Sequence, residues 1–157
     1  MFSMDAVDQA ILRRLQRDGR QTNRELAEAV GIAQSTALER TRALRDRGVI
    51  TGVHAAVDPA ALGRSVQALV AVRIRPQSRE TIESVRDSVA RLPETLGVFV
   101  VTGNEDILIH VAVPDTPYLR DFVLDQLARR KEIVDVRTTV VYEHIRPVEQ
   151  SELPPGK

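Results

Sequence analysis

The chain has 157 residues, of which 43% are hydrophobic, enough for one medium domain or two small ones. Lys and Arg together number 22, as do Asp and Glu, and this zero net charge disfavours a protein that holds nucleic acid by non-specific attraction alone. Aromatic residues make up only 3% and cysteine is absent, which disfavours base-stacking platforms for single strands and excludes disulfides, thiolate nucleophiles and sulfur-ligated metals.

The N-terminal stretch, MFSMDAVDQAILRRLQ, contains Asp5 and Asp8 and has no long apolar segment, unlike a secretory signal. No stretch approaches the roughly 18 apolar residues that a membrane-spanning helix needs. We therefore expect no membrane partner and a cytoplasmic location, with which the lack of cysteine is compatible.

Residues 5–50 have helical periodicity. Apolar residues recur at helical spacing from Asp5 until Asp18-Gly19 interrupts them, which predicts a first helix. Thr22 and Glu25 have the spacing of a capping box and predict the start of a short second helix that ends at Gly31.

A third helix is predicted from Gln34 to Asp46, after a tight turn at Gly31-Ile32-Ala33 and with Gly48 as its C-terminal stop. A helical wheel divides it into two sides. The side expected to be buried contains Ala37, Leu38, Thr41 and Leu44. The outward side contains Ser35, Thr36, Glu39, Arg42 and Ala43.

These features favour a DNA-binding helix-turn-helix over an ordinary helical hairpin with solvated arginines. Gln34 is expected to pair with adenine, and Ser35 and Thr36 with bases or phosphates. Arg42 is expected on guanine or phosphate, and Arg40, on the flank of the wheel, on phosphate. The predicted DNA-contacting set is Gln34, Ser35, Thr36, Glu39, Arg40 and Arg42. For Arg45 and Arg47, near the helix C-terminus, interaction with the helix dipole is the competing explanation.

The periodicity changes after Asp58-Pro59, from that of helices to the alternation of strands. Four strands and two helices then follow in the order βαββαβ, the ferredoxin-like arrangement. The predicted fold class is therefore α+β, a winged-helix-like helix-turn-helix domain followed by a ferredoxin-like domain. The expected boundaries are 1–50 for the first domain, 51–64 for an extended linker, 65–146 for the second domain and 147–157 for a mobile tail.

Both faces of the predicted sheet contain apolar residues, such as Leu69, Ala71, Leu108 and Ala112. Two helices can cover only one face of a four-stranded sheet. We therefore expect a second copy of the chain to cover the other face, which makes a homodimer.

Other candidate sites are weaker. His54, His110 and His144 lie far apart without metal-ligand spacing, and no nucleophile, carboxylate pair or phosphate loop is evident. We expect no catalytic residue, no metal site and no cofactor. By itself, the turn TGNED, Thr102–Asp106, is best explained as a hairpin loop.

The segments LAEAVGIAQSTALERTRALRDRGVITG, VTGNEDILIHVAV and VRTTVVYE, in this order, resemble the Lrp/AsnC (feast/famine) transcriptional regulators. The resemblance extends from about Asp5 to Arg146. The chain differs from the usual family pattern at Ala33, where many members have Ser or Thr, and at Glu105, where many have an aromatic residue.

This resemblance implies a regulator that binds double-stranded DNA, governs amino-acid or nitrogen metabolism, and forms dimers that assemble into tetramers, octamers or hexadecamers. It also implies a small effector, typically an amino acid, bound between dimers. The effector contacts carried over by the match are Gly103, Asn104, Glu105, Asp106, Thr138 and Thr139.

Three alternatives remain open at the level of sequence. The first is an architectural DNA-binding protein without an effector, and the second is a ligand-sensing module that regulates a partner enzyme. The third is an enzyme, because certain decarboxylases of haem and sirohaem biosynthesis resemble the same two-domain architecture. An outward helix face with small polar residues and arginines favours the DNA-binding regulator over the sensing module and the enzyme.

Overall fold

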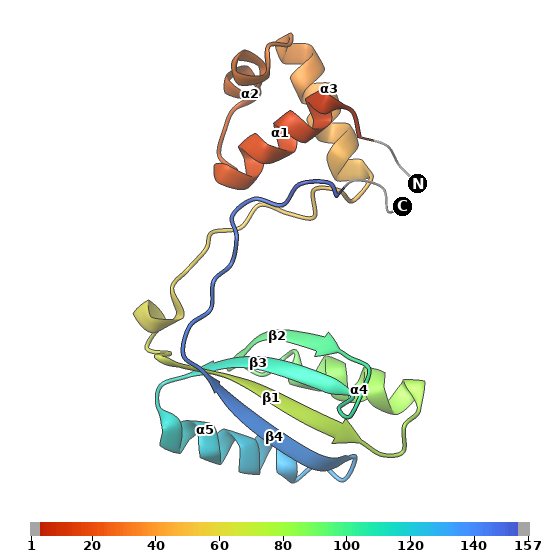
Figure 1. The fold of residues 1–157 in the computed structure, drawn as a ribbon, viewed down its shortest axis with the longest axis vertical. Coiled ribbons are helices and arrows are strands. Elements are labelled where there is room, and N and C mark those ends of the chain that lie inside the picture. The colour runs from red at the N-terminus through yellow and green to blue at the C-terminus, as the bar shows by residue number, and fades with distance from the viewer. Residues whose placement is uncertain (1–3, 154–157) are drawn as a thin grey trace. The chain divides into compact units, whose positions relative to one another are not determined.

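A computed structural model describes residues 4–153, which form two compact units (Figure 1). The N-terminal unit combines the chain up to Ala56 with the chain from Ile145 onward, and the sheet unit contains Val57–His144. Among the described residues, no helix has both the length and the apolar character needed to cross a lipid bilayer.

Three helices make up most of the N-terminal unit: α1 (Ala6–Arg17), α2 (Asn23–Val30) and α3 (Gln34–Asp46). The predicted capping box is present, because Thr22 Oγ1 accepts from the Glu25 N–H at 3.2 Å and the Glu25 carboxylate accepts from the Thr22 N–H at 2.7 Å. Gly31 ends α2 at φ 77°, a left-handed conformation that glycine adopts without strain.

A small apolar core joins the three helices. Its buried members are Leu26, Ala27 and Ala37, against which Leu15 of α1 and Ile32 pack. Ile11 of α1 and Leu44 of α3 are also buried. The expectation that Leu38 shares this core is wrong, since its side chain is 49% exposed. The buried strip of α3 is narrower than the wheel suggested.

The sheet unit has the predicted βαββαβ order. Its elements are β1 (Val66–Ile74), α4 (Arg79–Val89), β2 (Thr95–Val100), β3 (Ile107–Val113), α5 (Thr116–Phe122) and β4 (Ile133–Val141). The last turns after α5 are π-helical over Val123–Ala128, and a short 3₁₀ helix over Pro59–Leu62 precedes β1. All pairings are antiparallel and the strand order is β2-β3-β1-β4.

Alternate residues of the strands form the main core on one face of this sheet. β1 contributes Ala68, Val70, Val72 and Ile74, and β3 contributes Ile107, Ile109, Val111 and Val113. Helices α4 and α5 add Val85, Val89, Leu119 and Phe122. Both helices therefore cover the same face, as expected.

The opposite face, here called the open face, follows from the strand register. Leu69 of β1 lies opposite His110 of β3 and Thr139 of β4. In the next row, Leu108 pairs with both Ala71 and Phe99. Phe99 is 53% exposed, so the open face has an apolar centre, and the described helices of the sheet unit, α4 and α5, pack on the other face.

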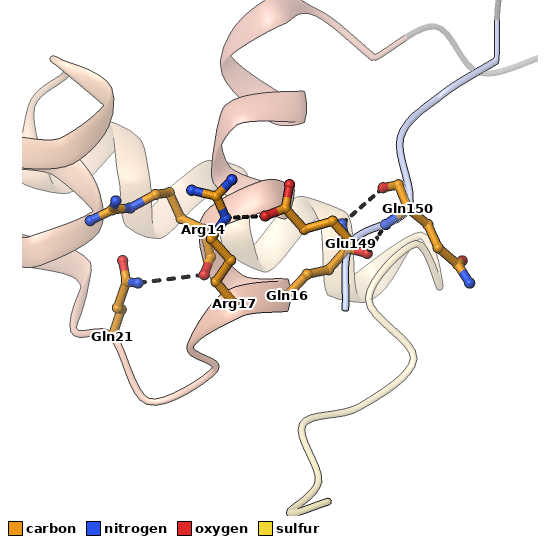
Figure 2. A network of polar contacts seen from close by, with 6 residues as sticks. All are labelled: Arg14, Gln16, Arg17, Gln21, Glu149 and Gln150. Atoms are coloured by element: carbon orange, nitrogen blue, oxygen red, sulfur yellow. Dashed lines mark hydrogen bonds and ion pairs between the residues drawn. The ribbon is translucent and has the colours of Figure 1, made fainter. Parts of the chain in front are cut away.

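The C-terminal segment, residues 145–153, contacts α1 (Figure 2). Gln16 Nε2 donates to the Gln150 carbonyl at 3.0 Å, and the Gln150 N–H donates to Gln16 Oε1 at 2.7 Å. Arg17 forms an ion pair with Glu149, and Gln9 donates to Glu152. The part of the expected tail that the structure describes therefore has partners in the N-terminal unit.

Candidate nucleic-acid interface and effector loop

The turn between α2 and α3 fixes the start of α3. The N–H groups of Gly31 and Ile32 both donate to the Ala27 carbonyl, at 2.9 and 3.0 Å. These two hydrogen bonds to one carbonyl at the end of α2, together with a glycine in the left-handed conformation, turn the chain sharply. The pair α2–α3 is thus a helix-turn-helix in which buried Leu26 and Ala27 of α2 pack with Ala37 of α3.

The outward face of α3 contains most of the predicted DNA-contacting residues. Gln34, Ser35, Glu39 and Arg42 are exposed, and Thr36 and Arg40 are half-buried. No side chain caps the N-terminus of α3, where Ala33 occupies the N-cap position. The N–H groups of this first turn therefore lack a side-chain acceptor from Ala33 or Ser35.

Arg40 is held inside the N-terminal unit. Its Nη1 donates to Asp5 at 2.6 Å and to Asp8 at 2.9 Å, which links α3 to the start of α1. These bonds raise the pKa of Arg40. The Asp8 N–H and then Arg40 lower the pKa of Asp5 below its usual range, so the Asp5 carboxylate is ionised near neutral pH. These ion pairs compete with the contact to phosphate that the sequence predicts for Arg40.

Three exposed residues of α3, Leu38, Arg45 and Asp46, are absent from the predicted DNA-contacting set. The wheel places Leu38 in the core, and for Arg45 interaction with the helix dipole is the competing explanation, yet both side chains are exposed. Leu38 lies about 100° around the helix from Ala37. This angle places Leu38 at the edge of the buried side. A wheel whose buried strip contains only Ala37, Thr41 and Leu44 would have predicted that Leu38 faces outward.

The predicted effector loop, Thr102–Asp106, joins β2 to β3 and faces two arginines. Gly103 has φ 129°, which favours glycine. Arg73 Nε donates to the Asn104 carbonyl at 2.8 Å, and Arg137 Nη1 donates to Glu105 at 2.8 Å. The loop therefore presents carboxylate and guanidinium groups side by side.

Asp106, also predicted as an effector contact, has its carboxylate engaged within the sheet unit. The residue is 6% exposed. One carboxylate oxygen accepts from the Ile74 N–H at 2.7 Å and the other from Gln77 Nε2 at 2.6 Å. Arg75 Nη1 lies 3.6 Å from the carboxylate. Asp106 thus fixes the end of β1 beside the loop.

The two predicted threonines lie on opposite faces of the sheet. Thr138 pairs with Val70, whose side chain is in the core, whereas Thr139 pairs with Leu69 of the open face. Both are exposed. Within one copy of the sheet unit, only Thr139 shares a face with Arg137, two residues before it in β4.

The histidines of the sheet unit lie together without forming a metal site. The rings of His110 and His144 are 5.3 Å apart and edge to face, and His110 Nε2 bonds Gln67 at 2.9 Å. Burial, and then His144, lower the pKa of His110, so its ring is neutral at pH 7. Across residues 4–153, no three His, Asp or Glu side chains gather as metal ligands.

Two family models match the chain. A family model described as the Lrp/AsnC ligand binding domain matches residues 67–150. Another, described as winged helix-turn-helix DNA-binding, matches residues 4–51.

Individual relatives match along nearly the whole chain. The HTH-type transcriptional regulator AldR of Mycolicibacterium smegmatis is 37% identical over 91% of this chain and 84% of its own length. The leucine-responsive regulatory protein of Rhizobium meliloti is 34% identical over 96% of each chain. A transcriptional regulator from Neisseria meningitidis, solved as a complex with L-Met, superposes with a TM-score of 0.84 at 32% identity and covers 97% of both chains.

The hydrogen bonds of Asp106 predict a structural effect of its removal. Asp106→Ala leaves the Ile74 N–H, at a fully buried residue, without its acceptor. We expect the free energy of unfolding of the sheet unit to fall by about 1–3 kcal/mol, with no effector present. Urea-dependent amide hydrogen exchange in β1 measures this change.

Asn104→Ala is the matched control, because Arg73 bonds the Asn104 main-chain carbonyl rather than its side chain. This variant should retain wild-type stability. An Asp106→Ala protein as stable as the wild type contradicts the structural role.

Proposed function

The chain belongs to the Lrp/AsnC family of transcriptional regulators, and on this premise we propose that α3 recognises operator sequences and that an amino acid is the effector. The protein is a DNA-binding regulator with an effector-binding domain. Its relatives are named as regulators, which confirms the expectation of a regulator rather than a decarboxylase of similar architecture. The proposed targets are genes of amino-acid or nitrogen metabolism, and the proposed location is the cytoplasm.

The exposed side of α3 is the observation that carries the DNA-binding part of the proposal. Gln34 and Ser35, near its N-terminus, are exposed and have the chemistry to bond base edges. Arg42, about two turns further on, is exposed and reaches guanine or phosphate. Because the net charge of the chain is zero, affinity has to come from this local arrangement and from several copies acting together.

We propose that two copies pair through their open faces. Leu69, Ala71, Leu108 and Phe99 supply an apolar centre, and the neutral ring of His110 adds no charge to it at pH 7. Burying this surface removes apolar area from water, at roughly 25 cal/mol per Å². A dimer presents two copies of α3 to a palindromic operator, and dimers assemble further into tetramers, octamers or larger oligomers.

An amino acid fits the charges at the effector loop. Its carboxylate suits the guanidinium groups of Arg73 and Arg137, and its ammonium suits Glu105. Bound between dimers, with Thr139 on the same face as Arg137, it shifts assembly only to the extent that it binds one arrangement more tightly. The L-Met complex of the Neisseria relative supports this class of effector.

Arg42→Ala should weaken operator binding by about 5- to 150-fold, the effect of losing a bidentate base contact. The operator is first obtained by pooled-oligonucleotide selection with the purified wild-type protein, and affinities are measured by gel shift. Arg91→Ala, which removes the same charge from an exposed position in the sheet unit, should bind as the wild type does. Equal affinities for all three proteins contradict the assignment of α3 as the DNA-contacting face.

Phe99→Asp should dissociate the dimer, because pairing buries the new carboxylate without a partner. Phe99 is exposed in the single chain, so the variant should fold normally. We expect sedimentation velocity to show a dimer dissociation constant raised more than about 100-fold. Leu124→Asp changes a side chain of similar exposure, 54%, on the helix side of the sheet unit and should leave the dimer intact. A dimeric Phe99→Asp protein argues against pairing through the open face.

Titration calorimetry with a panel of amino acids tests the effector. At least one should bind the wild type, and Glu105→Gln should abolish that binding because the ammonium loses its counter-charge. Glu80→Gln, an exposed change in the first turn of α4, should bind normally. If no amino acid releases or absorbs heat on mixing with the wild type, the protein is instead an effector-independent architectural regulator.

A further inference from the structure

Leu38 is a large apolar side chain on the outward side of α3. It is 49% exposed, whereas the buried side of the same helix contains Ala37 and Leu44 at 0% and 1%. A solitary exposed leucine is common on protein surfaces and requires no explanation by itself. The neighbours of Leu38 are what give its exposure a meaning.

Residues three or four apart on a helix are adjacent on its surface. Ser35 precedes Leu38 by three residues and Arg42 follows it by four, so the three exposed side chains form one ridge along α3. Ser35 and Arg42 are the proposed DNA contacts on either side. When they approach base edges, Leu38 is carried into the same groove.

The chemistry of the major groove offers one apolar partner there. Base edges present hydrogen-bond donors and acceptors, and the C5-methyl group of thymine is the apolar exception. Leucine has no polar atom in its side chain, so it can satisfy none of the donors or acceptors. The flanking cations Arg42 and Arg45 favour a polyanion over an apolar protein surface as the occupant of this ridge.

We propose that Leu38 is a specificity-determining residue that contacts the C5-methyl group of a thymine in each half-site. This inference rests on the proposed recognition of operator DNA by α3. Leu38 selects thymine over cytosine at one position of the half-site, next to the base or phosphate that Arg42 contacts. Its contribution to affinity is therefore confined to that position.

Deoxyuridine tests the contact directly, because it differs from thymidine only in lacking the methyl group. Each thymine of the selected operator is replaced in turn by deoxyuridine, and affinity is measured by fluorescence anisotropy. One replacement per half-site should weaken wild-type binding about fourfold, as expected for one lost methyl contact. Leu38→Ala should bind the operator more weakly and should show no further loss at that same replacement, since the partner of the methyl group is already gone.

Leu62→Ala is the matched control, because it makes the same chemical change at a leucine that is 62% exposed in the sheet unit. It should retain the fourfold sensitivity of the wild type. Pooled selection with Leu38→Ala gives a second measurement, in which thymine preference should relax at one position per half-site and persist elsewhere.

Three results overturn the inference. The first is a wild-type protein whose affinity is unchanged by every deoxyuridine replacement. The second is a Leu38→Ala protein that loses as much affinity as the wild type does at the sensitive replacement. The third is a Leu38→Ala protein that sediments differently from the wild type without DNA, which assigns Leu38 to a contact between copies. Failure of the proposed function looks different, because then the selection yields no preferred sequence for the wild type.

Discussion

The surface that α3 presents depends on the narrow strip by which it is anchored. Ala37, Thr41 and Leu44 are almost fully buried, and Arg40 beside them pairs with Asp5 and Asp8 of the first helix and its cap. Apolar packing fixes how deep the helix sits, and the ion pairs fix its rotation about its own axis. A rotation of one residue position would exchange Leu38 for Ala37. The chemistry of the outward face therefore follows from the buried one.

The sheet unit is governed by an equally simple constraint. Successive residues of a strand point to opposite faces, and both helices lie on one of these faces. The side chains at the other alternate positions of the four strands consequently face away from both helices. Here the centre of the surface that they form is apolar. Each unit thus has one packed side and one open side, which in our proposal takes a different partner: nucleic acid for the first unit and the sheet of a second copy for the other.

Local signals in the sequence predicted most of this architecture. Thr22, Glu25 and Gly31 marked the ends of α2 because caps are encoded by nearby residues, and alternation marked β1 and β3 because burial imposes it. Sequence could not separate Leu38 from the core strip, since it lies near the boundary between the two sides of the helix. Nor could it foresee the partners of Asp106, because Ile74 and Gln77 are about thirty residues away in the chain.

The docking of the C-terminal segment on α1 has a consequence for biosynthesis. The side chains of Gln9 and Arg17 are joined to partners that lie 143 and 132 residues further along the chain. A ribosome must therefore make the whole sheet unit before α1 receives these partners. Domains usually fold in the order of their synthesis, but here the unit that starts first is finished second. A nascent chain interrupted within the sheet unit therefore carries a helix-turn-helix whose α1 still lacks the C-terminal segment that bonds it.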